Sequence, residues 1–275
     1  MKLSFRKAGL LILSVAVVVG LSLATTLGQA APTRAAASTT IKVGIALDPP
    51  WTIRTPSGKL TGFNPALLRK LSGYLKTKVQ VVQTGWTGIV AGLQTNKYDM
   101  IGADLNATPE RSRVITFSVP YSYSGTTWFV KGSSSYKTIA DINNPKVTIA
   151  FVGGSDTESA TRKTLPKAKY RSLPNATAGD LIAEIEAGRS QVFAQSNYLG
   201  AALIKKYHYR AIPDLVKVPN GIGPVGIAWA VNKGNTALLA NLNAFLKHEI
   251  ATGDMAKLRK QYLTPAGFAA SVGLH

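Results

Sequence analysis

Short apolar runs of strand length alternate with amphipathic helical segments along most of this chain, and this alternation restricts its fold more than any other feature. Ile41–Ala46 is typical of a strand, and the leucines within residues 67–75 recur at helical spacing after Asn64-Pro65. Further strands are predicted at Val79–Gln83, Met100–Asp104, Val114–Val119, Val147–Val152, Gln191–Gln195 and Gly226–Val231. Further helices are predicted at Thr87–Thr95, from Ser155, and at Ala178–Ala187, Asn197–Tyr207, Asn235–Ile250 and Met255–Tyr262. We therefore predict an α/β fold.

Two segments rich in glycine, Tyr121–Gly125 and Asn220–Gly226, interrupt this alternation. They lie about a hundred residues apart, which is roughly the length of one small domain. We predict a discontinuous first lobe, residues 38–123 with 224–275, and a second lobe, residues 124–223. Two chain crossings between lobes form a hinge, and a ligand binds in the cleft that such a hinge closes.

The N-terminal segment has the order of a secretory signal peptide. Lys2, Arg6 and Lys7 precede the apolar run Leu10–Val19, and small residues follow. We predict that residues 1–37 are a signal peptide and leader, cleaved after Ala30 or after Ala35-Ala36-Ala37. The alternative is an uncleaved anchor helix, because the apolar stretch could nearly span a bilayer. The chain has no cysteine, so no lipid can be attached there. We expect a periplasmic or secreted protein that is not a lipoprotein.

The composition excludes several classes of function. Of the 275 residues, 45% are hydrophobic and 16% charged, a balance that excludes a disordered tail or a multi-span membrane protein. The absence of cysteine removes disulfides, thiolate catalysis and cysteine-based zinc sites. His208, His248 and His275 are too scattered for a metal centre, so we expect no cofactor.

Basic residues greatly outnumber acidic ones. There are 32 Lys and Arg against 13 Asp and Glu, a net charge of +19. They are spread singly, and the densest stretch, Arg162–Arg171, is predicted to lie between regular elements. No nucleic-acid-binding motif accompanies them, so we interpret the charge as a solvated basic surface and expect no nucleic-acid partner.

One continuous motif makes a family resemblance specific: Lys97–Arg111, with the sequence KYDMIGADLNATPER. Shorter matches in the expected order support it, at residues 43–51, 58–64, 86–89, 117–121, 153–155, 187–189 and 253–262. The chain resembles the amino-acid-type periplasmic solute-binding proteins of ABC transporters (bacterial extracellular solute-binding proteins, family 3). The resemblance implies a two-lobe, Venus-flytrap fold with two hinge crossings, which captures an amino acid or related small polar solute by hinge closure. It also implies delivery to a membrane permease, and we expect a monomer.

The resemblance assigns ligand contacts to two helix starts. Thr108-Pro109-Glu110 begins a helix well, but Arg111 is unfavourable in a first turn unless an anion faces it. The matching arginine of the family grips the ligand carboxylate. Ser155 to Glu158 fits a capping box, and free N–H groups at such a turn hold an anion in the family. Asp156 stands where the family usually has Thr or Ser, which opposes an ordinary carboxylate grip.

Other predicted contacts depart from the family pattern. Trp86 corresponds to a position that packs on the ligand, and Asp48 stands where the family often has an aromatic residue. Ser196 replaces an Asp that commonly holds the ligand ammonium. Asp104 and Asn106 occupy positions usually served by small hydroxyl residues or backbone carbonyls. We hypothesise that Asp104 takes over the ammonium contact.

Three alternatives remain open at this stage. The acids Asp48, Asp104 and Asp156 would also suit a cationic or polyamine-like ligand. Asp104 and Asp156 could share acid–base work in a dehydratase-like enzyme on the same scaffold. The chain could also serve a membrane sensor in place of a permease. No nucleotide-binding, zinc-protease or nucleophile-elbow motif supports catalysis, so we expect a binding protein and not an enzyme.

Overall fold

The computed structural model describes residues 40–263, apart from the side chains at positions 201–203, 205 and 206. The predicted signal peptide and leader, residues 1–37, therefore lie outside the described residues. Within residues 40–263, no helix has both the length and the apolar character needed to cross a bilayer.

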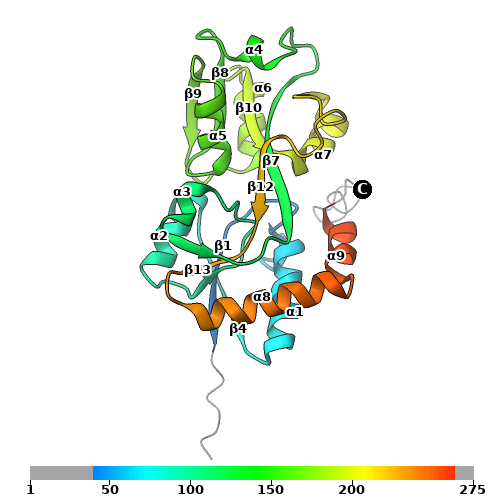
Figure 1. Cartoon of the computed structure of the whole chain (residues 1–275). Coiled ribbons are helices and arrows are strands. Elements are labelled where there is room, and N and C mark those ends of the chain that lie inside the picture. The colour runs from blue at the N-terminus through cyan, green and yellow to red at the C-terminus, as the bar shows by residue number, and fades with distance from the viewer. Residues whose placement is uncertain (1–39, 264–275) are drawn as a thin grey trace, which may run out of the picture. The chain divides into compact units, whose positions relative to one another are not determined.

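Two separate β-sheets organise the described chain, and they define the two lobes of an α/β fold (Figure 1). The sheet of the first lobe has the order β4 (Val79–Gln83), β1 (Ile41–Ile45), β5 (Met100–Ile101), β13 (Ala230–Asn232), β6 (Ile115–Phe117). The sheet of the second lobe has the order β11 (Tyr209–Ile212), β7 (Ser122–Lys131), β10 (Val192–Ser196), β8 (Thr148–Val152), β9 (Lys169–Leu173). A short hairpin of β2 (Ile53–Arg54) and β3 (Leu60–Thr61) completes the first lobe.

Helices accompany each sheet in sequence order. The first lobe holds α1 (Phe63–Leu75), η1 (Trp86–Gly88), α2 (Ile89–Gln94), α3 (Pro109–Ser112), α8 (Thr236–Ala251) and α9 (Asp254–Tyr262). The second lobe holds α4 (Ile139–Ile142), α5 (Asp156–Thr164), α6 (Ala178–Glu186) and α7 (Asn197–Tyr207). Side-chain caps fix several starts: Thr108 accepts from the Arg111 N–H, and Thr138 and Thr177 each form a full capping box.

The first-lobe core is built from aromatic side chains. The Trp51 ring meets Phe63 edge-on at 5.1 Å between centroids, and Trp229 stacks on Phe245 at 5.8 Å. These four side chains are at most 1% exposed. Burial of each contributes about 1.5–3 kcal/mol to folding, so the wall behind Trp51 is rigid.

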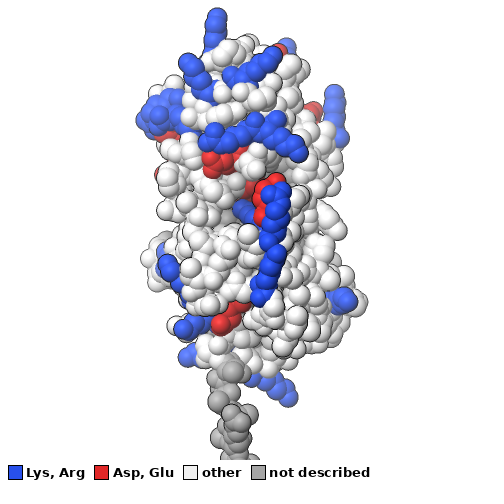
Figure 2. Space-filling model, turned by 60° about the vertical axis from the view of Figure 1, so that its left-hand side comes forward, with Lys and Arg blue, Asp and Glu red and all other residues white. Residues whose placement is uncertain are grey.

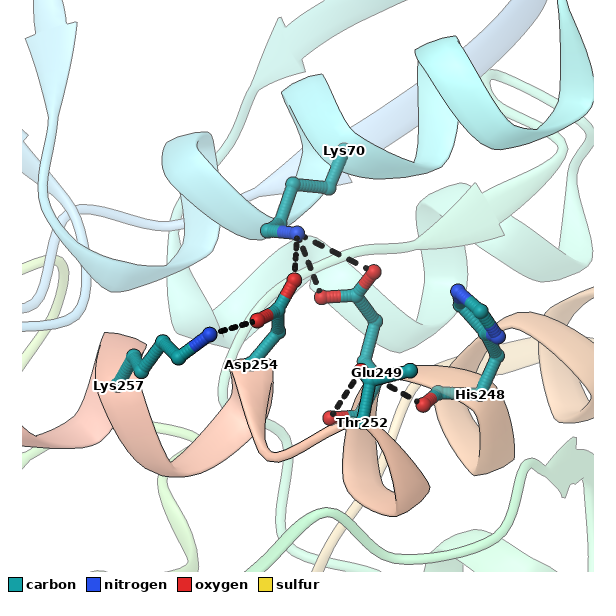
Figure 3. Close-up of polar contacts among 6 residues, drawn as sticks. All are labelled: Lys70, His248, Glu249, Thr252, Asp254 and Lys257. Carbon is teal, nitrogen blue, oxygen red and sulfur yellow. Dashed lines mark hydrogen bonds and ion pairs between the residues drawn. The ribbon is translucent and has the colours of Figure 1, made fainter.

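The final two helices are tied to α1 by charge (Figure 3). The Lys70 ammonium lies 3.0 Å from Glu249 Oε2 and 2.8 Å from Asp254 Oδ2. Asp254 also pairs with Lys257 at 2.8 Å, whereas His248 takes part through its backbone carbonyl, which accepts from Thr252. Glu249 is 4% exposed, so Lys70 neutralises a buried carboxylate.

Strands β7 and β12 (Ile222–Ile227) run antiparallel, side by side, where the chain passes between the two lobes (Figure 1). Their pairing extends from Ser122 opposite Ile227 to Thr126 opposite Ile222. Gly125 permits this approach, because a Cβ there would lie 2.5 Å from the Asn220 carbonyl oxygen. The predicted lobe boundaries at 123/124 and 223/224 fall inside these strands and stay predictions.

Several predicted elements need correction. The predicted strand Gly226–Val231 is wrong as one element, because β12 ends at Ile227 and β13 begins at Ala230. The ten-residue strand β7 was not predicted as a strand, since its Ser, Gly and Thr residues hide its buried, apolar half. Strands β9 and β11 were also missed.

The dense basic stretch does not lie between regular elements, which corrects the sequence interpretation. Arg162 belongs to α5, where it pairs with Glu158 at 2.8 Å and covers the Tyr170 ring at 4.7 Å from its centroid. Arg171 belongs to β9 and holds Glu184, which is 5% exposed. On the face shown in Figure 2, Lys and Arg side chains stand in separate groups with uncharged surface between them.

Candidate functional site

A cavity lies where residues of both lobes meet. From the first lobe it is lined by Leu47, Asp48, Pro49, Trp51, Trp86, Asp104 and Asn106, and from β7 by Ser124. From the second lobe it is lined by Val152, Ser155, Asp156, Thr157, Ala176, Thr177, Ala178, Gln195 and Ser196. The cavity is narrow, since about 30 Å³ of it is open to the centres of water-sized molecules.

Seven of the eight residues predicted from the sequence line this cavity, although they come from widely separated parts of the chain. They are Asp48, Trp86, Asp104, Asn106, Ser155, Asp156 and Ser196. Arg111 lies beside the cavity. Its Nη1 donates to the Asn106 carbonyl at 3.0 Å, and its Nη2 donates to the Gly154 carbonyl at 3.3 Å. A ligand carboxylate, predicted to bind Arg111, would thus compete with these two carbonyl oxygens for the guanidinium group.

Asp48 and Asp104 form a pair of carboxyl groups on the first-lobe wall. Asp104 follows β5, and Asp48 follows β1 in a turn that bridges to Thr52. The two side chains share a hydrogen bond. Burial raises the pKa of Asp48 well above its usual value, and the negative charge of Asp104 adds to this rise. At least one proton is therefore held by the pair at a pH where isolated carboxyl groups are ionised.

Asn64 fixes the orientation of Asp104. Its Nδ2 donates to Asp104 Oδ1 at 3.0 Å and to Thr52 Oγ1 at 3.1 Å. Asn64 is fully buried at the start of α1, where it belongs to the core rather than to the cavity lining. Burial raises the pKa of Asp104 to about 7, while the Asp48 and Asn64 contacts oppose that rise. One free carboxylate edge is thus presented at a defined angle.

Three side-chain hydrogen bonds cross the cleft directly. Asn106 Nδ2 donates to Asp156 Oδ2 at 2.5 Å, and Thr87 Oγ1 donates to the Gly153 carbonyl at 3.0 Å. The third is the contact of Arg111 with Gly154. These bonds hold the start of α5 against the η1 and Asn106 segments of the first lobe.

The second-lobe wall includes the starts of three helices, α5, α6 and α7. The Ser155 hydroxyl donates to the Val152 carbonyl at 2.6 Å and accepts from the Glu158 N–H at 3.2 Å. The Glu158 carboxylate accepts from the Gly154 N–H, one residue before the position that a full capping box requires. Ser196 precedes α7, makes no side-chain cap and lines the cavity.

Sequence reasoning missed several lining residues. Gln195 and Ser124 are 7% and 2% exposed and line the cavity. Trp51 packs in the core and also lines the cavity. Gln195 ends a predicted strand next to Ser196, which was the available signal. Ser124 carried none beyond its place in a crossing segment.

No group of three His, Cys, Asp or Glu side chains within residues 40–263 is arranged to hold a metal ion.

The family assignment follows from comparison with known proteins. The model of the bacterial extracellular solute-binding proteins, family 3, matches residues 41–265. The chain therefore belongs to this family, and its two-lobe fold is the one that the family's solved structures have.

Individual relatives agree with this assignment. The chain is 24% identical over 260 residues to the L-cystine-binding protein TcyJ of Escherichia coli, covering 94% of this chain and 95% of that protein. It is 38% identical over 98 residues to a Haemophilus influenzae protein named "Probable amino-acid ABC transporter-binding protein", covering 35% and 38%. That match spans little more than a third of the Haemophilus protein.

A solved structure matches most of the fold. The crystal structure of the ancestral amino acid-binding protein AncCDT-1, a precursor of cyclohexadienyl dehydratase, has a TM-score of 0.73 and 30% identity. The alignment covers 82% of this chain and 96% of that one. The names of the family and of these relatives denote binding proteins.

Proposed function

We propose that this chain is the extracytoplasmic solute-binding component of an ABC importer, which captures an amino acid or a related small polar solute by hinge closure. The observation that carries the proposal is the cavity itself, whose polar lining comes from both lobes while only two antiparallel strands, β7 and β12, pair along the passage between them. A ligand in such a cleft can bond to both walls at once and so favour the closed state.

The assignment to transport, and not to catalysis, draws on the family, because the names of the family and of these relatives denote binding proteins. A membrane permease is the proposed partner, with cleavage of the N-terminal segment releasing a monomer outside the cytoplasm.

The decisive experiment measures binding and turnover together. Mature protein is unfolded and refolded to remove carried-over solute, then titrated calorimetrically with the common amino acids, amines and organic acids. We expect one class to bind with a thermal stabilisation of several degrees, because ligand at about a hundred times its Kd adds about 2.7 kcal/mol. The bound solute should be recovered chemically unchanged after prolonged incubation. Conversion of the solute, or silence across the whole panel, contradicts the proposal.

A further inference from the structure

The charge of the cavity lining is one-sided. Asp48 and Asp104 contribute carboxyl groups from the first lobe, and Asp156 contributes one from the second. Among the lining residues that the structure describes, none is Lys, Arg or His. The nearest predicted cation, Arg111, directs its guanidinium donors to two backbone carbonyls. Burial keeps a proton on the Asp48–Asp104 pair, and a cation placed against these carboxyl groups favours their ionised form, whereas an anion opposes it.

An independent observation identifies an unused acceptor in the same wall. Asn106 is 4% exposed and lines the cavity. Its Nδ2 is engaged by Asp156, but its buried Oδ1 has no hydrogen-bond partner among the described residues. A buried acceptor without a donor is unfavourable, so a donor from the ligand would stabilise this oxygen. A protonated nitrogen supplies such donors, whereas a carboxylate has none.

Two aromatic side chains complete the lining. Trp51 and Trp86 both line the cavity, and Trp86 also packs partly against the cores of both lobes. Indole faces attract ammonium and guanidinium groups, with a strength that increases as water is excluded. The cavity wall thus combines carboxyl groups, an amide oxygen without a donor, and indole rings. Such a wall suits a positively charged nitrogen.

We propose that the solute bound here carries a protonated amine or guanidinium group facing Asp48 and Asp104, so that the ligand is a cation overall and these two side chains determine its selection. This inference rests on the proposed function and names the class of solute. Asp48 forms one edge of the nitrogen site, Asp104 the other, and Asn106 Oδ1 accepts an additional N–H. Asp156 balances a second positive charge where the ligand has one.

The test uses matched pairs that differ in charge and little in shape. L-arginine is compared with L-citrulline, L-lysine with L-norleucine, and putrescine with 1,4-butanediol, all by calorimetric titration of the refolded protein. We expect at least one cation to bind 30-fold or more tightly than its neutral counterpart. Putrescine binding as tightly as lysine identifies free amines as the source of the cation, and binding confined to arginine or lysine identifies basic amino acids.

Variants then assign the preference to residues. Asp48→Asn and Asp104→Asn should each reduce the cation-to-neutral ratio by a factor of ten or more. Asp99→Asn is the matched control, because it removes the same charge from an exposed carboxylate that accepts from the Lys42 N–H away from the cavity. Thermal unfolding shows whether each cavity variant folds. If one does not, Asp156→Asn replaces it as the second variant that removes a cavity carboxylate.

The outcomes separate this inference from the proposed function. If a neutral or acidic amino acid binds more tightly than every cation, the inference is overturned while solute binding stands. If no amino acid or amine binds at all, the proposed function fails as well. An unchanged ratio in folded Asp48→Asn and Asp104→Asn proteins likewise overturns the roles given to these residues.

Discussion

The carboxyl group of Asp104 serves the binding site but lowers the stability of the folded protein. It is 9% exposed, and burial raises its pKa to about 7. In the folded protein it therefore retains a proton that the unfolded chain releases near pH 4. Such a group lowers the free energy of unfolding as the pH rises through that interval.

Replacing this carboxyl group should therefore stabilise the ligand-free protein at high pH. Asp104→Asn keeps an oxygen to accept from Asn64 and adds an amide that donates to Asp48. We expect the variant to exceed the parent by about 4 kcal/mol at pH 8 and to match it near pH 4. Urea unfolding at a series of pH values measures this difference.

The charged and titratable groups that act on Asp104 or respond to it are Asp48, Asp156, Arg111 and Tyr121. Because the charge of Asp104 also raises the pKa of Asp48, the difference between parent and variant reports on the carboxyl pair. Asp99→Asn serves as the control for removing an exposed carboxylate outside the cavity. A parent that gains on the variant as the pH rises would contradict the raised pKa.

The residues of the site were largely predictable, but their contacts were not. The family resemblance led to Asp48, Asp104 and Asn106, because each stands at a ligand position of the family pattern. That Asn106 reaches Asp156 in the other lobe depends on the packing of two sheets, which no local pattern encodes. Arg111 was identified from its unfavourable place in a first turn, yet the carbonyl groups that it contacts carry no sequence signature.

At the level of elements, predictions succeeded where side-chain periodicity was strong. The helix α7 and the strand β4 have the predicted bounds, and α8 follows its leucine stripe. Strand β9, with the sequence KYRSL, is a partly exposed edge strand whose burial does not produce an apolar run. Strand β7 can be identified from its pairing with β10, β11 and β12, which the sequence alone does not show.

The attachment of α8 and α9 to α1 depends on one lysine. Lys70→Met should destabilise the protein by about 1–2 kcal/mol, because Glu249 then keeps a buried charge without its partner. Thermal or urea unfolding at neutral pH measures the loss. Lys257→Met is the matched control: Lys257 contacts Asp254 from a side chain that is 77% exposed, so we expect little change. Equal losses in the two variants would show that the burial of Glu249 is unimportant.

At the scale of the whole molecule, closure brings one glycine against the opposite lobe. Gly154 has φ of +76°, and a Cβ there would lie 2.6 Å from Thr87 Cα. Gly154→Ala should therefore oppose closure and weaken every ligand by a factor of ten or more, without altering the preference between charged and neutral solutes. Calorimetric titration of one matched solute pair measures both quantities.

Gly188 provides the control for backbone strain. It has φ of +69°, but a Cβ there would have no neighbour within 4 Å. Gly188→Ala should thus lower stability through its backbone while leaving affinity unchanged. Equal affinity losses in both alanine variants would mean that strain, and not the contact across the cleft, is responsible.

The place of β13 in the first sheet also determines the order in which parts of a newly made chain can fold. This strand, residues 230–232, lies between β5 at 100–101 and β6 at 115–117. A chain emerging from its N-terminal end cannot complete that sheet until residue 232 has appeared, whereas five strands of the other sheet, β7 to β11, lie within residues 122–212. These five strands can therefore pair first, while β5 and β6 still lack the strand between them. Because the first lobe folds late, there is an interval in which the chain is still incompletely folded and can pass through a narrow pore.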